Sequence, residues 1–379
     1  MIPTFNRKEY LKQALESVKN QSYEEIEVVI IDGNSSDGTR KYLRSLEEQN
    51  IKLVFHDEPK GQSKARNRGI EEAEGDYILF LDDDDVLYNE TIDRMVETIE
   101  STLDNCAGVF TAEKRFGNLD KIHEVSSGKI KDTFNLDFGT SCSMFKTEIL
   151  REIGGFDENL NASEDLDLII NIFSEDYCIY GVNEPLYKRR IHEHQISKRY
   201  SENVTAYREI LDKHSEELSI KEKIEWNRAI SWNYNKLGQD KAAAKNIQNS
   251  IKLFKQNISR LNNSENYYCF KAISHQYQEL DTRDLAVTGF DKLLETLNDQ
   301  QKNFQKTGLL YAKLGFNFAE IGESKKSRNC LKKSIKRKPD EIYKYYFYFW
   351  LLFGKKGYET ARKIEKNTMN IFKRFKLCS

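Results

Sequence analysis

Proline is scarce in this sequence, and long hydrophobic runs are missing. Only 4 of the 379 residues are proline, so helices can run for long stretches without interruption. No segment reaches the roughly 18 consecutive apolar residues that a membrane-spanning helix needs. The first residues, Met-Ile-Pro-Thr-Phe-Asn-Arg, lack the charged and then apolar pattern of a secretory signal. The sequence predicts a cytoplasmic protein, and peripheral contact with the cytoplasmic face of a membrane stays open.

Paired cysteines and a strong net charge are also missing. The 6 cysteines lie far apart and form no C-x-x-C pair, which argues against a zinc site or a disulfide framework. Lys and Arg number 59 and Asp and Glu number 61, so the formal net charge is −2. Because general nucleic-acid binding depends on excess positive charge, no nucleic-acid partner is predicted.

Short β-like runs alternate with helical patterns in the first half of the chain. Strands are predicted at residues 26–32, 51–57 and 76–82, and helices at 9–21, 38–50 and 61–75. This alternation predicts an α/β domain with a mostly parallel central sheet flanked by helices, which binds ligands at the carboxyl ends of the strands. Asp32 and the run Asp82–Asp85 follow two of these strands, so we expect them to share one crevice. Only Met1 and Ile2 precede Pro3, so the first strand is either a stub or begins upstream.

The pattern changes to all-helical in the second half. Strand-like runs vanish from about residue 205, and we predict two domains, 1–204 and 205–379. Residues 229–254 and 308–340 echo each other, because each contains a helix that ends near a glycine, Gly238 or Gly322, before a second helix. These segments resemble degenerate tetratricopeptide helix pairs. An ordinary helical bundle is the alternative.

Four consecutive aspartates directly follow the predicted buried strand. Tyr77–Leu81 is apolar and Asp82–Asp85 comes next. Like charges this close repel one another unless a cation neutralises them. A cation site is one interpretation of the run, and a solvated acidic turn is the other.

Four further signals lie near predicted strand or helix ends. Residues 31–39 form a loop of small residues that enters a helix, which suits a nucleotide. Arg66 precedes the acidic strand, and a guanidinium pairs well with phosphate or carboxylate. Glu164 and Asp165 open an amphipathic helix, where capping of the helix dipole is the alternative explanation. His192 lies in a basic segment, 188–200, near the end of the α/β region.

Taken in order, these motifs resemble a family-2 glycosyltransferase of the GT-A fold. The series begins with Ile-Pro-Thr-Phe-Asn-Arg, Asp-Gly-Asn-Ser-Ser-Asp-Gly-Thr and Ala-Arg-Asn. It continues with Leu-Asp-Asp-Asp-Asp, Gly-Gly-Phe-Asp-Glu with Ser-Glu-Asp, and a His-x-x-x-x-Ser from His192 to Ser197. Each motif is weak alone, but six in order are specific. The similarity covers about half of the chain.

The resemblance implies roles for named residues. Asp82, Asp83 and Asp84 would hold the sugar nucleotide together with Mg²⁺ or Mn²⁺, and Asp85 would orient the loop. The implied metal ligands are Asp84, Asp82 and His192. The implied substrate-binding residues are Pro3, Thr4, Asp32, Arg66, Asp82, Asp83, Glu164 and His192. Asp165 would be the catalytic base that deprotonates the acceptor. Many relatives carry a second aspartate where this chain has Gly33.

The expected function is metal-dependent, inverting transfer of a sugar from a nucleotide diphosphate, UDP above all, to a hydroxyl. The acceptor would be a glycan or a lipid-linked molecule in polysaccharide, glycolipid or protein-glycan synthesis. Two alternatives are a catalytically idle sugar-nucleotide-binding or scaffold protein and a nucleotidyltransferase. The helical region is open to a protein partner. Residues 342–354 are aromatic and 362–376 basic, so they form either packed terminal helices or an interfacial membrane contact.

Overall fold

The computed structural model divides the chain into two compact units, Met1–Ile210 and Leu211–Ser379. It describes residues 1–102, 105–130, 139–192, 200–257, 260–261, 263–278, 287–288, 291–295, 314–315, 317–319 and 322–337. Ser197 and the segments 342–354 and 362–376 lie outside these described residues. The predicted domains, 1–204 and 205–379, stay predictions, because compactness does not test what each part does.

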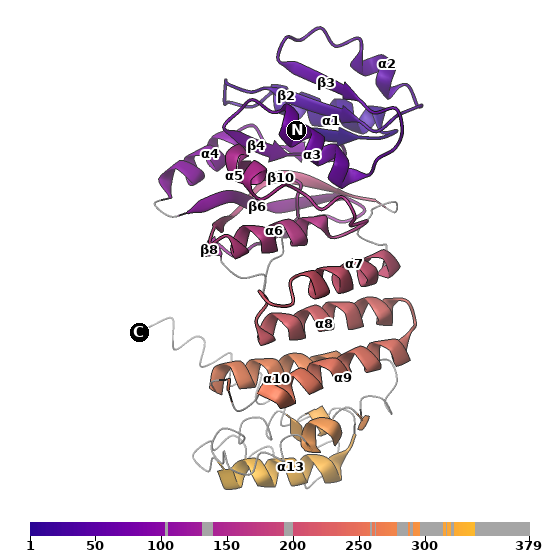
Figure 1. The fold of residues 1–379 in the computed structure, drawn as a ribbon, viewed down its shortest axis with the longest axis vertical. Coiled ribbons are helices and arrows are strands. Elements are labelled where there is room, and N and C mark those ends of the chain that lie inside the picture. Colours follow the sequence, from indigo (N-terminus) through magenta and orange to yellow (C-terminus); the bar gives the residue numbers. More distant parts are fainter. Residues whose placement is uncertain are drawn as a thin grey trace. The chain divides into compact units, whose positions relative to one another are not determined.

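The first unit begins with three parallel strands that alternate with helices (Figure 1). The strands are β1 (Ile2–Thr4), β2 (Val28–Asp32) and β3 (Ile51–Phe55), and the helices are α1 (Lys8–Lys19), α2 (Thr39–Leu43) and α3 (Gln62–Glu72). Thr4 lies opposite Asp32 in the β1–β2 register, and Asp32 lies opposite Phe55. The carboxyl ends of the three strands therefore meet at one edge, as the alternating pattern predicted.

A second, mixed sheet continues beside β1. Its strands run in the order β4-β9-β6-β10-β5, with β7 on β6 and β8 on β10. Their bounds are β4 (Tyr77–Phe80), β5 (Val86–Leu87), β6 (Cys106–Gly117), β7 (Lys121–His123), β8 (Gly128–Ile130), β9 (Ser143–Lys146) and β10 (Cys178–Ile191). The Met1 amino group donates to the Leu79 carbonyl at 2.8 Å, and the Leu81 amide donates to the Met1 carbonyl at 3.1 Å. These two bonds join the β1 edge to β4.

The second sheet contains antiparallel pairs as well as a parallel one. β6 pairs with β10 in parallel, whereas β4–β9, β6–β9, β6–β7, β8–β10 and β5–β10 are antiparallel. Only three residues separate β6 from β7, and a parallel pair would need a crossover of about a dozen residues or more. The predicted α/β class with helices flanking a central sheet is confirmed, and this second part is mixed.

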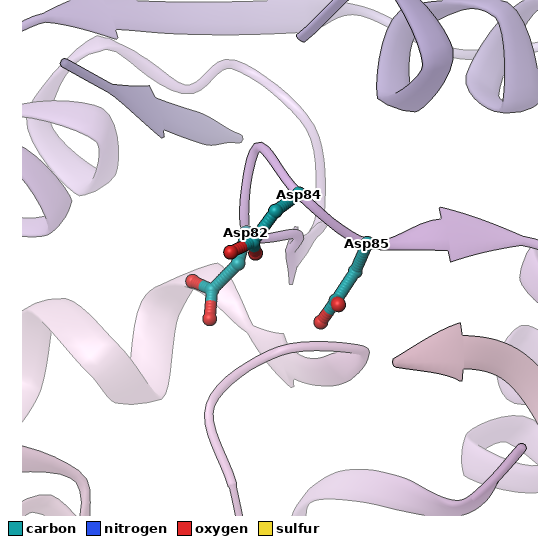
Figure 2. A group of neighbouring side chains, drawn as sticks. All are labelled: Asp82, Asp84 and Asp85. Atoms are coloured by element: carbon teal, nitrogen blue, oxygen red, sulfur yellow. The ribbon is translucent and has the colours of Figure 1, made fainter. Parts of the chain in front are cut away.

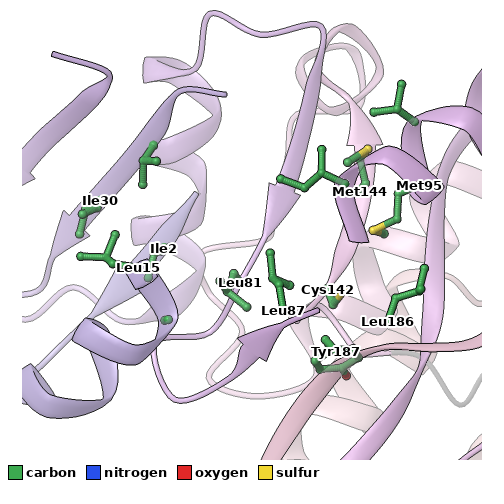
Figure 3. Packing of buried hydrophobic residues seen from close by; sticks show 14 of the residues in the cluster. Ile2, Leu15, Ile30, Leu81, Leu87, Met95, Cys142, Met144, Leu186 and Tyr187 are labelled. Atoms are coloured by element: carbon green, nitrogen blue, oxygen red, sulfur yellow. The ribbon is translucent and has the colours of Figure 1, made fainter. Parts of the chain in front are cut away.

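Buried side chains anchor the acidic turn at both ends. Leu81 and Leu87 flank Asp82–Asp85 and are 1% and 4% exposed. Both belong to one core cluster with Ile2, Met95 and Met144, which lie on the strands and helices around the turn (Figure 3). Because well-packed cores permit little movement, the position of the turn is set by the core on either side of it.

The remaining described helices that begin in the first unit are α4 (Thr91–Ser101), α5 (Thr147–Glu152), α6 (Glu164–Ser174) and α7 (Tyr200–Lys213), of which α7 continues past the boundary at Ile210. After α5 the backbone turns through Gly154 and Gly155, which have φ of 82° and 70°. A side chain on Gly155 would meet the Asn67 carboxamide at 2.5 Å. That carboxamide exchanges hydrogen bonds of 2.8 Å with the backbone of Phe156. The turn is thereby tied to α3, and it leads the chain toward α6.

The second unit is helical where the structure describes it. Its longer helices are α8 (Ile220–Lys236), α9 (Asp240–Asn257), α10 (Asn263–Gln278) and α13 (Ser324–Arg337). They share a core that includes Ile224, Ile247, Phe254, Phe270 and Cys330. None of the described helices is both long enough and apolar enough to cross a membrane.

Two helix ends in this unit have the same local geometry. Gly238 and Gly322 have φ of 68° and 82°. In each case the next residue donates its amide to a carbonyl five residues earlier, Gln239 to Tyr234 and Glu323 to Phe318. This pattern is a glycine-terminated helix end of the Schellman type. The assignment of tetratricopeptide-like repeats stays a prediction.

Candidate active site

Three carboxylates converge on the turn between β4 and β5. Asp82, Asp84 and Asp85 each offer an oxygen within 4.8 Å of the others (Figure 2). The turn is closed by a hydrogen bond of 3.1 Å from the Asp85 amide to the Asp82 carbonyl. Asp83 lies apart from this group, because its carboxylate accepts a bond of 2.7 Å from the Thr4 hydroxyl. The carboxylates of Asp82, Asp84 and Asp85 therefore lie together, whereas that of Asp83 faces Thr4.

Cationic side chains surround the acidic turn. One Arg7 nitrogen donates to Asp83 at 3.1 Å and to Asp84 at 2.6 Å. On Asp84 the same oxygen lies 2.9 Å from the Nε2 atom of His192. Asp84 is thus held between Arg7 and His192, and its carboxylate stands at the centre of the cluster. Sequence reasoning placed His192 here but assigned nothing to Arg7, although Arg7 ends the first motif.

The crowding of carboxylates alters their proton affinity. Burial raises the pKa of Asp83 to about 7, although the Arg7 charge and the Thr4 hydroxyl oppose the change. Burial also raises the pKa of Asp85, and the charges of Asp82 and Asp84 raise it further. Burial is the main cause of both shifts, and the charges of the neighbouring aspartates add to them.

Asp85 fixes the turn to the neighbouring strands. The Ser141 hydroxyl donates to Asp85 at 2.6 Å and accepts from the Asp82 amide at 3.2 Å. The backbone amide of Arg190 also donates to Asp85, at 2.9 Å. Through these contacts Asp85 can orient the turn. Its carboxylate also lies with those of Asp82 and Asp84.

Arg190 holds the same turn from β10. Its Nε atom donates to the Asp84 carbonyl at 3.0 Å, and its guanidinium lies 4.7 Å from the Tyr10 ring and 4.4 Å from the Phe116 ring. Cation–π contacts on two rings fix the plane of the guanidinium. Arg190 was not predicted as a site residue; its position two residues before His192 was the available signal.

Arg66 joins the acidic turn to α6. It is 3% exposed and donates to Asp82 at 3.1 Å and to Glu164 at 2.5 Å. Its guanidinium also lies 5.5 Å from the Phe156 ring. Sequence reasoning expected Arg66 to approach the nucleotide. In the structure its charge is shared by two carboxylates, and this placement favours a positioning role.

Replacement of Arg66 by methionine is expected to lower the free energy of unfolding by about 3–5 kcal/mol, because it leaves Glu164 buried without its charge partner. Urea unfolding checks this value. The matched control is Arg68→Met on the same helix, since Arg68 is exposed and pairs with Glu71 at 2.9 Å; a loss of about 1 kcal/mol or less is expected there. Equal losses in the two variants would contradict the positioning role.

Asp165 lies one residue after Glu164 on the first turn of α6. Its Oδ1 atom accepts a hydrogen bond of 2.9 Å from the Leu166 amide, and Ser163 before it has a left-handed backbone with φ of 58°. Burial raises the pKa of Asp165, the Glu164 charge raises it further, and Arg66 opposes both. Asp167 is fully buried and contacts Asn171 within the helix. Asp165 thus combines a hydrogen-bonded position with a raised proton affinity, and it does so on α6, away from the aspartates of the turn.

The residues predicted to bind the nucleoside lie at the edge formed by β1 and β2. Asp32 is fully buried, and its Oδ2 atom accepts from the amides of Asn34 and Ser35 and from Arg40. Its Oδ1 atom has no hydrogen-bond partner among the described residues. Pro3 lies in β1 opposite Ile31, and the exposed Phe5 ring follows at the strand end. This edge therefore offers one unused acceptor beside an exposed ring.

The fold and these contacts define a class of protein. An α/β sheet brings a carboxylate turn, an arginine bridge and a helix-terminal carboxylate to one region, and an acceptor edge lies on the adjoining parallel strands. This arrangement fits the GT-A glycosyltransferase that the sequence motifs resemble.

Comparison with known proteins identifies the family. Residues 1–154 match the model of glycosyl transferase family 2. Over 205 residues the chain is 30% identical to the putative teichuronic acid biosynthesis glycosyltransferase TuaG of Bacillus subtilis, a match that covers 52% of this chain and 80% of that protein. The chain belongs to glycosyl transferase family 2 and is a glycosyltransferase.

A second relative and two crystal structures extend the comparison. The chain is 29% identical over 185 residues to the GalNAc(5)-diNAcBac-PP-undecaprenol beta-1,3-glucosyltransferase of Campylobacter jejuni, covering 46% of this chain and 59% of that protein. The fold is similar to S. aureus TarS 1-349, with a TM-score of 0.51, 16% identity and coverage of 78% and 87%. The same protein in complex with UDP-GlcNAc gives a TM-score of 0.50, 17% identity and coverage of 86% and 90%.

Proposed function

We propose that this chain catalyses metal-dependent, inverting transfer of a sugar from a nucleoside diphosphate to a hydroxyl of a cell-envelope glycan or its lipid-linked precursor. The observation that carries the proposal is the Arg66 bridge, which holds the acidic turn through Asp82 and the Asp165 segment through Glu164. Relatives named for teichuronic acid biosynthesis and for a diphospho-undecaprenol acceptor support the acceptor class. Family membership favours transfer over an idle scaffold or a nucleotidyltransferase. A cytoplasmic location stays a prediction.

The acidic turn fits a small divalent cation. Mg²⁺ and Mn²⁺ prefer oxygen ligands and bind through one or two carboxylates together with substrate phosphates. Asp82, Asp84 and Asp85 each supply such an oxygen. Burial raises the pKa of Asp85 and the charges of Asp82 and Asp84 raise it further; a cation would relieve this repulsion. His192 stands on the Asp84 side of the group. When bound, the cation would neutralise the charge of the leaving diphosphate.

The protein side chains account for the proton transfer and the geometry of attack. Asp165 takes the proton of the acceptor hydroxyl as its oxygen forms a bond to the anomeric carbon. The bond from that carbon to the diphosphate oxygen breaks on the opposite side, so the anomeric configuration inverts. Glu164 and Arg66 hold Asp165 in position relative to Asp82, and the raised pKa of Asp165 makes it a better proton acceptor than an ordinary aspartate.

The β1–β2 edge supports a nucleoside pocket at Pro3, Thr4 and Asp32. The unused Oδ1 atom of Asp32 can accept a hydrogen bond from a base N–H, and uracil offers such a group. A side chain at Gly33 would meet Thr4 and Phe5 at ordinary contact distances of 3.5 to 3.7 Å, and the glycine itself offers no carboxylate. Asp32 alone is therefore assigned to base recognition.

A panel of UDP-, GDP- and dTDP-sugars tests the donor assignment. With Mn²⁺ present, we expect purified protein to hydrolyse a UDP-sugar slowly and to prefer it to a GDP-sugar, because the guanine edge differs in shape and donors from uracil. Asp32→Asn should weaken UDP binding about 10-fold, with Asp37→Asn on the exposed part of the same loop as the matched control. Hydrolysis of a GDP-sugar alone would overturn the base assignment but leave transfer intact.

A further inference from the structure

The nearly neutral chain consists of two oppositely charged halves. Residues 1–210 contain 26 Lys and Arg against 42 Asp and Glu, a formal charge of −16. Residues 211–379 contain 33 Lys and Arg against 19 Asp and Glu, a formal charge of +14. An anionic surface would therefore repel the catalytic half and attract the helical half.

Helix α9 concentrates part of this positive charge on one exposed face. Lys241, Lys245, Lys252 and Lys255 are all exposed, and at about 100° per residue they fall within about 40° of a common direction. They extend over about 21 Å of helix at about 1.5 Å per residue. The other face of the helix, with Ile247 and Phe254, is buried in the helical core. We call these four residues the lysine stripe.

Apolar side chains lie exposed at the neighbouring end of α8. Trp232 is 41% exposed and Leu237 is 37% exposed, and the Lys236 amino group lies 5.2 Å from the Trp232 ring. Only Gly238 and Gln239 separate Leu237 from Asp240, the first residue of α9. Tryptophan beside lysine is a common pairing at the boundary between lipid and water, where the ring meets headgroups and acyl carbons.

We propose that the helical unit binds the surface of an anionic lipid bilayer through the lysine stripe and the exposed Trp232. Lysine outnumbers arginine by 26 to 7 in residues 211–379. Lysine carries a compact, strongly hydrated point charge, whereas the planar guanidinium of arginine is suited to bidentate recognition of single phosphates. This composition fits a surface of many headgroups better than one tightly held polyanion. Such binding would bring the enzyme to lipid-linked acceptors, a consequence that rests on the proposed function.

Flotation of the full chain with lipid vesicles tests the proposal. We expect binding to vesicles of phosphatidylglycerol and phosphatidylcholine, none to phosphatidylcholine alone, and release as salt rises, since charge attraction is screened. A variant with the four stripe lysines changed to glutamine should bind at least about tenfold more weakly. Trp232→Ser should remove the part of the binding that resists salt.

The matched control has the same net charge. Lys19, Lys41, Lys121 and Lys129 are exposed on the acidic unit, and changing these four to glutamine should leave vesicle binding unchanged or only slightly weaker. Equal loss in both quadruple variants, or equal binding to neutral vesicles, would overturn the proposal.

Binding to soluble heparin without vesicle binding would also overturn it and would assign the stripe to a polyanionic glycan. Salt-sensitive oligomers without vesicle binding would assign it to a second copy of the chain. The Asp165→Asn variant should bind vesicles as the wild-type protein does. Membrane binding can therefore be tested independently of the proposed sugar transfer.

Discussion

Replacement of Asp165 by asparagine is expected to slow sugar transfer by about 10²-fold or more while melting temperature and donor affinity stay near native. Asparagine keeps the shape of the side chain and can still accept the Leu166 amide bond of 2.9 Å. It cannot take a proton from the acceptor. Transfer rate, nucleotide affinity and thermal melting of this one variant therefore separate the chemical role from the structural one.

The stability of the variant follows from the pKa of Asp165. Burial and Glu164 raise the folded-state pKa above the ordinary value, so the native state holds this proton more tightly than the unfolded state does. Stability from this group is present at low pH and is lost as pH rises through the folded-state pKa. A neutral asparagine avoids that loss, so we expect no fall in melting temperature at neutral pH.

The competing account treats Asp165 as a cap of α6. It predicts a loss of about 1 kcal/mol or less with turnover largely kept. Glu175→Gln, an exposed change from carboxylate to amide at the other end of α6, is the matched control and should transfer normally. The acidic limb of the wild-type rate profile should also lie above the pH of an ordinary aspartate and vanish in Asp165→Asn. A stable variant with a normal rate would remove Asp165 from the mechanism.

Much of the site follows from local sequence patterns. The sequence predicts strand ends at Asp32 and Asp82, because a β-branched or apolar run stops at a carboxylate in each case. In the structure Thr4 relates the two ends, because it lies opposite Asp32 in the register and donates to Asp83 at 2.7 Å. Glu164 and Asp165 are visible because they open a helix with a clear apolar face. Each inference uses residues that are close in sequence.

The parts that were missed depend on contacts between distant residues. Arg7 meets Asp83 and Asp84 across β1 and β4, and Arg190 reaches the Asp84 carbonyl from β10. No spacing rule relates such positions, since the sheet order that joins them is set by tertiary packing. The same limit applies to Arg66, whose partners could not be told from its sequence context.

Charge was also misleading when it was summed over the whole chain. A net charge of −2 excludes a uniformly basic surface, but it hides halves of −16 and +14 that lie in different compact units. The boundary between the units is needed before the charges can be counted separately. The structure is also needed to show which lysines share an exposed helix face. Lys241 and Lys252 are exposed because the opposite face of α9 packs into the core.

Replacement of Asp84 by alanine is expected to lower transfer by about 10²-fold or more, because a metal ligand that stabilises leaving-group charge contributes several kcal/mol. The fold should survive, since Arg7 keeps its bond to Asp83 at 3.1 Å and removal of one charge relieves repulsion within the turn. The matched control is Asp120→Ala, an exposed aspartate paired with Lys114, which should remain fully active.

Metal binding by this variant can be measured without turnover. In the wild-type protein, Mn²⁺ with UDP should raise the melting temperature, because a ligand that binds only the folded state stabilises it; Asp84→Ala should lose most of this rise. Excess chelator should abolish wild-type transfer, and added Mn²⁺ or Mg²⁺ should restore it. Full activity in excess chelator would mean that Arg7, Arg66 and His192 compensate the diphosphate alone. The carboxylates of the turn would then serve to position these cations rather than to bind a metal.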